Sequence, residues 1–224
     1  MNKVIAVDGP SGSGKSSVSK AVGKKLGFLH VDSGALYRIM TYLAIKEGVD
    51  TTSPEAVQTV AEKCDIELKV EDGAIKYYIQ GRTLGDELRT PEINANASYV
   101  ARVKEVRDKI TELLRSMTKF GDIIVEGRDI TTVVFPDTPA RFFLTASAEA
   151  RAARRQKEEV EKGIAAQSAE EVKNSLLMRD KIDSSRKFAP LRKADGVIEI
   201  DSSNMTLEES IEAMLSSLPS DYVA

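Results

Sequence analysis

The sequence predicts an α/β fold built on a parallel sheet. Five apolar runs have the length of buried strands, and helical patterns follow most of them. Strands that alternate with helices favour a parallel sheet covered by helices on both faces. The 224 residues, 42% of them hydrophobic and 30% charged, suffice for one domain with a proper core. The predicted strands are residues 4–7, 28–31, 123–126, 141–144 and 197–200.

A glycine-rich loop follows the first strand at once. The loop reads GPSGSGKSS and consists of Gly9, Pro10, Ser11, Gly12, Ser13, Gly14, Lys15, Ser16 and Ser17. It matches the pattern G-x-x-x-x-G-K-[ST] at every fixed position, and an amphipathic helix follows it. Backbone N–H groups at such a helix N-terminus converge on phosphate. We therefore predict that the loop binds a nucleoside triphosphate, with Lys15 at the β- and γ-phosphates and the Ser16 hydroxyl on Mg²⁺.

Polar residues also follow the second and third strands. The segment DSGALYR at 32–38 follows the second strand, and VEGRDI places Arg128 and Asp129 beyond the third. Ligands collect outside the carboxyl ends of parallel strands, so these groups are expected in one crevice. Taken singly, Asp32 or Ser33 also fits a helix cap.

A third polar segment is RDKIDSSR. Its spacing places Arg179, Asp183 and Arg186 on one face of a helix. An ordinary ion pair on the helix surface explains either arginine–aspartate pair by itself. It does not explain why all three polar segments occur in one chain.

Residues 65–84 interrupt the alternation of strands and helices. Period-two apolar patterning on both sides of Asp72-Gly73 predicts a β-hairpin, read here as a small inserted lobe. One helix is expected after Pro91, with Ile93, Ala97, Val100 and Val103 facing the core. The last helix is expected to begin near Thr206, where TLEE resembles a capping box.

Composition excludes several function classes. The single cysteine, Cys64, rules out an internal disulfide, and the single histidine, His30, leaves little for Ser-His-Asp chemistry. Residues 151–193 hold 12 Lys or Arg against 7 Asp or Glu within a chain of net charge −3. This basic segment lacks interleaved aromatic residues, so bound nucleotide phosphates fit it better than nucleic acid. No apolar run of membrane-spanning length and no signal-peptide layout is present, which favours a cytoplasmic protein.

The motifs together resemble the bacterial cytidylate kinase family of P-loop nucleoside monophosphate kinases. The resemblance covers nearly the whole chain, through DGPSGSGKSS, DSGALYR, NANAS, VEGRDITTVVFPD, TASAEARAARR, RDKIDSSRKFAPL and IDSS in family order. It implies a P-loop NTPase fold with three α/β/α layers and a five-stranded parallel sheet. The implied parts are a core at 1–32, 118–150 and 186–224, a monophosphate-binding lobe at about 33–117 with a β insert at about 65–90, and a lid at about 151–165.

The resemblance also implies a reaction and its residues. ATP with Mg²⁺ would phosphorylate CMP or dCMP, in a monomer that needs neither nucleic acid nor a membrane. The implied catalytic residues are Lys15, Arg128, Arg154, Arg155 and Arg186. The implied CMP-binding residues are Ser33, Tyr37, Arg38, Ser98, Arg107, Arg128, Asp129, Arg179, Asp183 and Arg186.

Within this set, Arg38, Arg128 and Arg186 would hold the acceptor phosphate, and Arg179 and Asp183 would lie at the ribose. Ser98, Asp129 and Arg107 would read the base. The acceptor oxygen is already ionised near neutral pH, so catalysis needs positioning and charge stabilisation rather than a general base.

One position departs from the family pattern. The family usually has glycine after the isoleucine of GRDI, and this chain has Thr131, so a less tight turn is expected beside Asp129. A kinase for UMP or another nucleoside monophosphate stays open as the alternative. A GTPase switch lacks its N-K-x-D segment here, and a shikimate- or gluconate-type kinase would not need the hairpin.

Overall fold

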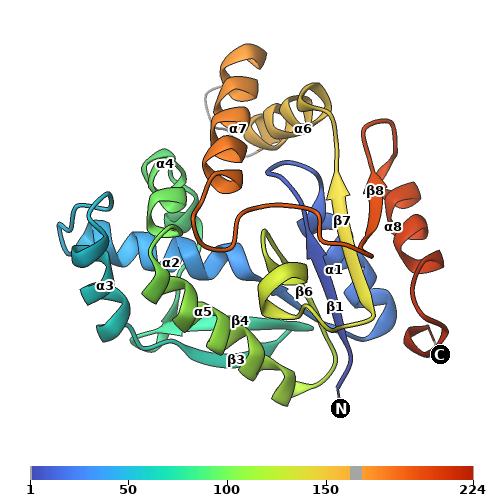
Figure 1. Ribbon diagram of the computed structural model, residues 1–224, viewed down its shortest axis with the longest axis horizontal. Coiled ribbons are helices and arrows are strands. Elements are labelled where there is room, and N and C mark those ends of the chain that lie inside the picture. The colour runs from blue at the N-terminus through green and yellow to red at the C-terminus, as the bar shows by residue number, and fades with distance from the viewer. Residues whose placement is uncertain (1, 162–167, 224) are drawn as a thin grey trace.

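The computed structural model describes residues 2–161 and 168–223, whose strands form one mostly parallel sheet (Figure 1). The strands are β1 (Val4–Asp8), β2 (Leu29–Asp32), β3 (Glu67–Glu71), β4 (Ala74–Ile79), β5 (Arg82–Thr83), β6 (Ile123–Gly127), β7 (Ala140–Thr145) and β8 (Ile198–Asp201). The α-helices are α1 (Lys15–Leu26), α2 (Ser33–Lys46), α3 (Pro54–Lys63), α4 (Pro91–Val100), α5 (Lys104–Ser116), α6 (Ala148–Glu161), α7 (Ala169–Ser184) and α8 (Leu207–Ser216). Shorter helical turns span Asp86–Arg89, Met117–Phe120, Ile130–Val134 and Ser220–Tyr222.

The sheet order confirms the predicted parallel core and corrects its size. All five predicted strands form, and they run parallel in the order β2-β6-β1-β7-β8. Within the described part of the chain the sheet has eight strands rather than five, because the strands from residues 67–83 continue it.

The hairpin forms where the sequence predicted it but joins the edge of the main sheet. β3 and β4 are antiparallel, and the turn between them has positive φ at Asp72 and Gly73, 49° and 71°. β4 then pairs with β2 through His30 and Ala74. Apolar periodicity predicts a hairpin but not the strand with which the hairpin pairs. A hairpin in a separate lobe and a hairpin at the edge of the main sheet each bury one face, so both have the same pattern.

Side chains of β1 alternate between two hydrophobic layers. Ile5 and Val7 pack with α1 and α8, whereas Val4 and Ala6 pack with α2 and α5 on the opposite face. All five residues of β1 are buried. The central strand is thus covered on both sides, as a parallel sheet requires. α6 and α7 pack on each other at the top of Figure 1, on the side of the phosphate loop.

Two helix predictions have different outcomes. Thr206 and Glu209 form the predicted capping box of α8. The helix expected after Pro91 also forms, and its four predicted core residues are all buried, but it is shorter than predicted: α4 ends at Val100, and Val103 is the N-cap of a second helix, α5. Apolar spacing continues across the break, so periodicity alone does not reveal it.

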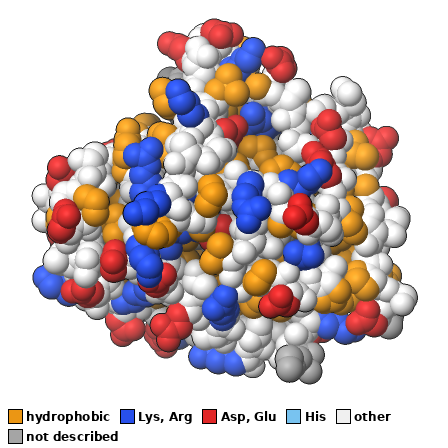
Figure 2. Space-filling model, viewed as in Figure 1, with side chains coloured by type: hydrophobic (Ala, Val, Ile, Leu, Met, Phe, Trp, Pro, Cys, Tyr) orange, Lys and Arg blue, Asp and Glu red, His pale blue; other side chains and the backbone are white. Residues whose placement is uncertain are grey.

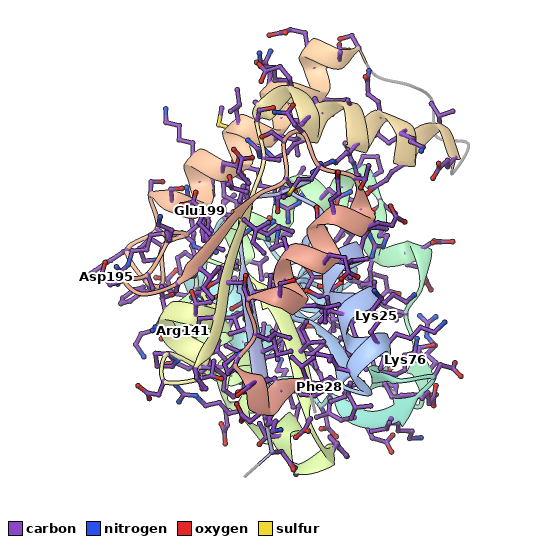
Figure 3. All side chains as sticks on the ribbon, turned by 90° about the vertical axis from the view of Figure 1, so that its right-hand side faces the viewer. Lys25, Phe28, Lys76, Arg141, Asp195 and Glu199 are labelled. Atoms are coloured by element: carbon purple, nitrogen blue, oxygen red, sulfur yellow. The ribbon has the colours of Figure 1, made fainter. Side chains whose placement is uncertain are left out.

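The two ends of the described chain meet on the side away from α6 and α7 (Figure 1). The Tyr222 hydroxyl bonds the Val4 carbonyl at 3.3 Å, and its ring lies 6.1 Å from that of Phe28. Figure 3 labels Phe28 at this end of the molecule, near the short turn after α8. Among the described residues, no helix is long and apolar enough to span a membrane.

Candidate active site

The glycine loop takes a tight path at the carboxyl end of β1. A side chain at Gly9 would place its Cβ 1.9 Å from the Leu144 carbonyl oxygen, so only glycine fits there. Lys15 is 5% exposed, and its ammonium group donates to the Pro10 carbonyl at 2.7 Å. Burial, and then the positive charge of Arg128, lowers the pKa of Lys15 to about 7. The lysine is therefore inside the loop, where an anionic ligand would restore its charge.

Glu126 faces the same loop from the end of β6. Burial alone would raise its pKa, but His30, Lys15 and the Ser16 hydroxyl outweigh burial and hold the pKa well below its usual range. The His30 Nε2 atom lies 3.7 Å from the Glu126 carboxylate. An ionised carboxylate therefore lies next to the loop serine that the sequence assigned to Mg²⁺.

A cluster of arginines lies across the crevice from the loop. Arg128 contacts Asp183 at 3.2 Å, and Arg186 lies 3.6 Å from the same carboxylate. Arg38 pairs with Asp32 at 2.7 Å, and Asp32 also caps α2 through the Ala35 N–H. The cap prediction for this segment is therefore confirmed, and phosphate binding by Arg38 stays a prediction.

The predicted helical face of the third segment is only partly correct. α7 includes Arg179 and Asp183 but ends at Ser184, so Arg186 lies beyond it. Its guanidinium still reaches Asp183 and donates to the Ala189 carbonyl at 2.9 Å. Burial, and then Arg128, lowers the pKa of Arg179 to about 10.

This cluster has unused hydrogen-bonding capacity. The Nε atoms of Arg38, Arg179 and Arg186 are buried and have no hydrogen-bond partner among the described residues. Buried donors are normally satisfied, so three of them in one cluster indicate a missing acceptor. The side chains also include five arginines (38, 107, 128, 179 and 186) against three aspartates (32, 129 and 183), an excess of two positive charges.

Ser98, Arg107 and Asp129 come together at the break between α4 and α5. Arg107 pairs with Asp129, both nearly fully buried, and donates to the Ala101 carbonyl at 3.0 Å. The Ser98 hydroxyl donates to Asp183 at 3.2 Å. Because the chain turns at residues 101–103, two side chains nine positions apart can serve one site.

Two more of the predicted side chains lie beside this group. The Arg107 guanidinium lies 5.3 Å from the centre of the Tyr37 ring, within cation–π range. Ser33 donates to the Glu126 carbonyl at 2.6 Å, which ties the start of α2 to β6.

The predicted lid arginines have three different environments. Arg151 is buried, pairs with Asp180 at 2.5 Å and donates to the Ser11 carbonyl. Arg154 donates to both oxygens of Ser202. Arg155 pairs with Glu158 and Glu159 of its own helix and, unlike Arg151 and Arg154, is not shown bonded to the loop or to Ser202. The last part of the predicted lid, residues 162–165, lies outside the described residues.

Sequence reasoning missed four polar residues of the crevice, namely Asp8, Glu126, Asp180 and Ser202. Asp180 accepts from the Ser11 N–H at 3.3 Å, and Ser202 donates to the Ser13 carbonyl at 3.1 Å. Asp8 and Glu126 are the polar ends of otherwise apolar strands. Their position at the carboxyl ends of predicted strands could have identified them, because these ends border the ligand crevice.

A phosphate loop at the end of the central parallel strand, faced by buried arginines, defines the class of P-loop phosphotransferases. The family model described as cytidylate kinase matches residues 5–220. The chain belongs to the cytidylate kinase family, and it is a kinase.

Similar proteins support this assignment over almost the full length. A Clostridioides difficile protein named cytidylate kinase is 43% identical, and the match covers 97% of this chain and 98% of that protein. One of the same name from Streptomyces avermitilis is 46% identical, over 95% and 90% of the two chains. An uncharacterised protein from Eubacterium ventriosum shares the fold, with a TM-score of 0.56 at 11% identity over 96% of each chain.

Proposed function

We propose that the protein transfers the γ-phosphoryl group of ATP to CMP or dCMP, which yields CDP or dCDP and ADP. The observation that carries this proposal is the arginine cluster, with two excess positive charges and three Nε donors that have no partner in the described part of the chain. A nucleoside monophosphate brings a dianionic group with several acceptor oxygens, which satisfies both the donors and the charge. Membership in the cytidylate kinase family supports cytosine as the base.

The donor side fits a triphosphate with Mg²⁺. Lys15 and the loop N–H groups would hold the phosphates of ATP. Ser16, with the ionised Glu126 beside it, would hold the metal, because Mg²⁺ prefers one or two protein oxygens together with substrate phosphates. No cluster of three or more metal-binding side chains exists in the part of the chain that the structure describes, so the metal would arrive with the nucleotide. Bound there, Mg²⁺ would neutralise phosphate charge.

The acceptor phosphate oxygen attacks the γ-phosphorus, and the bond to the β,γ-bridging oxygen breaks. The oxygen is already ionised, so no side chain needs to remove a proton. Arg38, Arg128 and Arg186 orient the acceptor phosphate. Lys15, with Arg154 and Arg155 of α6, stabilises charge on the transferred group. For this last role Arg155 must leave Glu158 and Glu159, so a rearrangement of α6 is part of the proposal.

The base is read by the Arg107–Asp129 pair and Ser98. Cytosine presents an amino donor at position 4 and acceptors at N3 and O2. The Asp129 carboxylate and the Ser98 oxygen suit the amino group, and Arg107 suits the acceptors. Uracil reverses the pattern at two positions and would leave buried groups unpaired. Arg179 and Asp183 would hold the ribose.

We further propose a cytoplasmic monomer that acts on free nucleotides, without nucleic acid or membrane. The face in Figure 2 mixes Lys and Arg with Asp and Glu and shows no unbroken basic surface. Two arginines of α6 are engaged at the crevice: Arg151 pairs with Asp180, and Arg154 donates to Ser202.

A panel of nucleoside monophosphates with ATP and Mg²⁺ tests the function. We expect kcat/KM for CMP to exceed that for UMP by at least about tenfold for each mismatched group. Arg128→Met should abolish most CMP turnover, while Arg192→Met, at an exposed arginine outside the cluster, should not. Equal use of UMP and CMP by the wild-type enzyme would replace the cytosine assignment with the UMP one.

A further inference from the structure

Asp8 is a buried carboxylate that the proposed reaction does not use. It is the last residue of β1, immediately before Gly9 of the phosphate loop, and none of it is exposed to solvent. In the sheet it lies between Gly127 of β6 and Phe143 of β7. Most carboxylates in the crevice pair with an arginine. No ion pair joins Asp8 to any described residue, so another group must compensate its burial.

Three donors from one short turn provide that compensation. The Ile130 N–H donates to one carboxylate oxygen of Asp8 at 2.8 Å. The Thr131 N–H and the Thr131 hydroxyl donate to the other, at 2.8 and 2.6 Å. Thr131 is 1% exposed, so water does not substitute for its hydroxyl. A carboxylate held by three donors fixes their positions closely.

The turn that Asp8 holds follows directly on two acceptor-site residues. Arg128 and Asp129 precede Ile130, and Asp129 accepts backbone bonds from Val133 and Val134 as this turn begins. Asp8 therefore connects the start of the phosphate loop, at Gly9, to the turn that follows Arg128 and Asp129. Burial is the main reason that the pKa of Asp8 is raised to about 6, and the Thr131 hydroxyl opposes this rise.

We propose that Asp8 is a positioning residue that sets Arg128 and Asp129 relative to the phosphate loop, with the Thr131 hydroxyl as its third donor. The inference rests on the proposed function, because it assigns cytosine discrimination to the Asp129 that Asp8 holds in place. The turn is thus not loosened by Thr131, as the sequence suggested, but tied by an additional bond to β1.

Thr131→Val tests this proposal, because it removes the hydroxyl and keeps the branched shape. Thr132→Val is the matched control: the Thr132 hydroxyl is buried too and has no partner among the described residues. We expect Thr131→Val to raise the KM for CMP and to lower the CMP-to-UMP ratio of kcat/KM, each by about fivefold to tenfold, the effect of one lost bond to a charged group. Thr131→Ser, which keeps the hydroxyl, should stay within about twofold of wild type, as should Thr132→Val.

Two results would overturn the proposal. One is a Thr131→Val enzyme whose Tm is lowered but whose KM for CMP and CMP-to-UMP ratio of kcat/KM equal those of Thr132→Val. The Thr131 hydroxyl would then contribute only to stability. The other is a Thr131→Ser enzyme as impaired as Thr131→Val. If Thr131→Val does not fold, Thr131→Ala gives the same reading, since it removes the hydroxyl without the added backbone freedom of glycine. Failure of the proposed function shows separately, as a wild-type enzyme that prefers another nucleotide.

Discussion

At the scale of single residues, the crevice is built from charges that the protein buries before any ligand arrives. Lys15 donates inward to the Pro10 carbonyl, and Arg179 has a buried donor without a partner in the described chain. Such groups are costly to bury alone and gain most when an anion arrives. The same residues that weaken the free protein therefore prepare it for phosphate.

Lys15→Ala should fold normally and lose most phosphoryl transfer. In the proposed reaction the lysine stabilises charge on the transferred group, so its loss should cost at least ~3 kcal/mol of activation free energy, on the order of a hundredfold in kcat. The measurement is turnover at saturating ATP and CMP. Lys24→Ala, at an exposed lysine of the helix that follows the loop, is the control. Near-normal turnover of Lys15→Ala would contradict the assignment.

Asp8 should make stability depend on pH in an unusual direction. The pKa of Asp8 is about 6 in the folded protein against 3.8 for an unperturbed aspartate, chiefly because of burial, with Asp129 acting in the same direction. The protonated form is favoured by folding, so this contribution is full below pH 3.8 and is lost as the pH rises through 6. The neighbouring Lys15 also faces this carboxylate.

To test this pH dependence, the free energy of unfolding is measured for wild type and for Asp8→Asn between pH 4 and pH 7. An uncharged amide does not titrate, so stability of the variant relative to wild type should increase over this range by up to about 3 kcal/mol. A constant difference across the range would show that Asp8 does not titrate there.

At the scale of elements, the lid helix α6 is held to the phosphate loop from one side. Arg154 bonds Ser202 and Arg151 bonds the Ser11 carbonyl, whereas Arg155 pairs with Glu158 and Glu159 of its own helix. The first turns of α6 are therefore anchored, and we expect its second half to be the part that closes over the phosphate.

We expect limited trypsin digestion to cut between residues 155 and 161 in the free protein. A bisubstrate analogue that occupies both nucleotide sites should protect this segment, because closure engages Arg155 and excludes water. Mass spectrometry of the fragments measures the cut, and ATP alone serves as the control for single-site occupancy. Equal cleavage with and without the analogue would mean that the second half of α6 is a fixed surface helix.

Sequence patterns located elements better than they located contacts. The core strands, the phosphate loop and the capping box at Thr206 depend on neighbours within a few residues. The loop and the capping box are where the sequence predicted them, and the strands agree with their predicted bounds to within one residue. The break before Lys104 and the pairing of His30 with Ala74 depend on tertiary packing, which local periodicity does not encode.

For the candidate site, sequence reasoning named side chains but not their partners. Ser98 and Arg107 are nine positions apart, and the sequence did not reveal the bend at residues 101–103 that lets both serve one site. Asp180 and Ser202 were missed because each contacts the loop from a distant part of the chain, 169 and 189 positions away. No short motif spans such separations.

At the scale of the whole molecule, the charge balance of the crevice predicts how strongly a ligand stabilises the fold. CMP at 100 times its Kd should add about 2.7 kcal/mol of stability, or about 5–10 °C in Tm for a domain of this size. Cytidine lacks the phosphate that the arginine cluster is expected to bind, so at the same concentration it should shift Tm by far less. Differential scanning fluorimetry measures both, and equal shifts would place the affinity in the base pocket alone.

The sheet order has a consequence for how the chain is synthesised. β1 is the central strand, yet both of its neighbours, β6 and β7, come late: Asp8 and Ile123 are 115 positions apart. A ribosome that adds about 5–20 residues each second needs roughly 6–23 s to cover that distance. During this interval the nascent VIAVD segment has neither partner strand, so it is the part of the chain most exposed to aggregation and most suited to a chaperone.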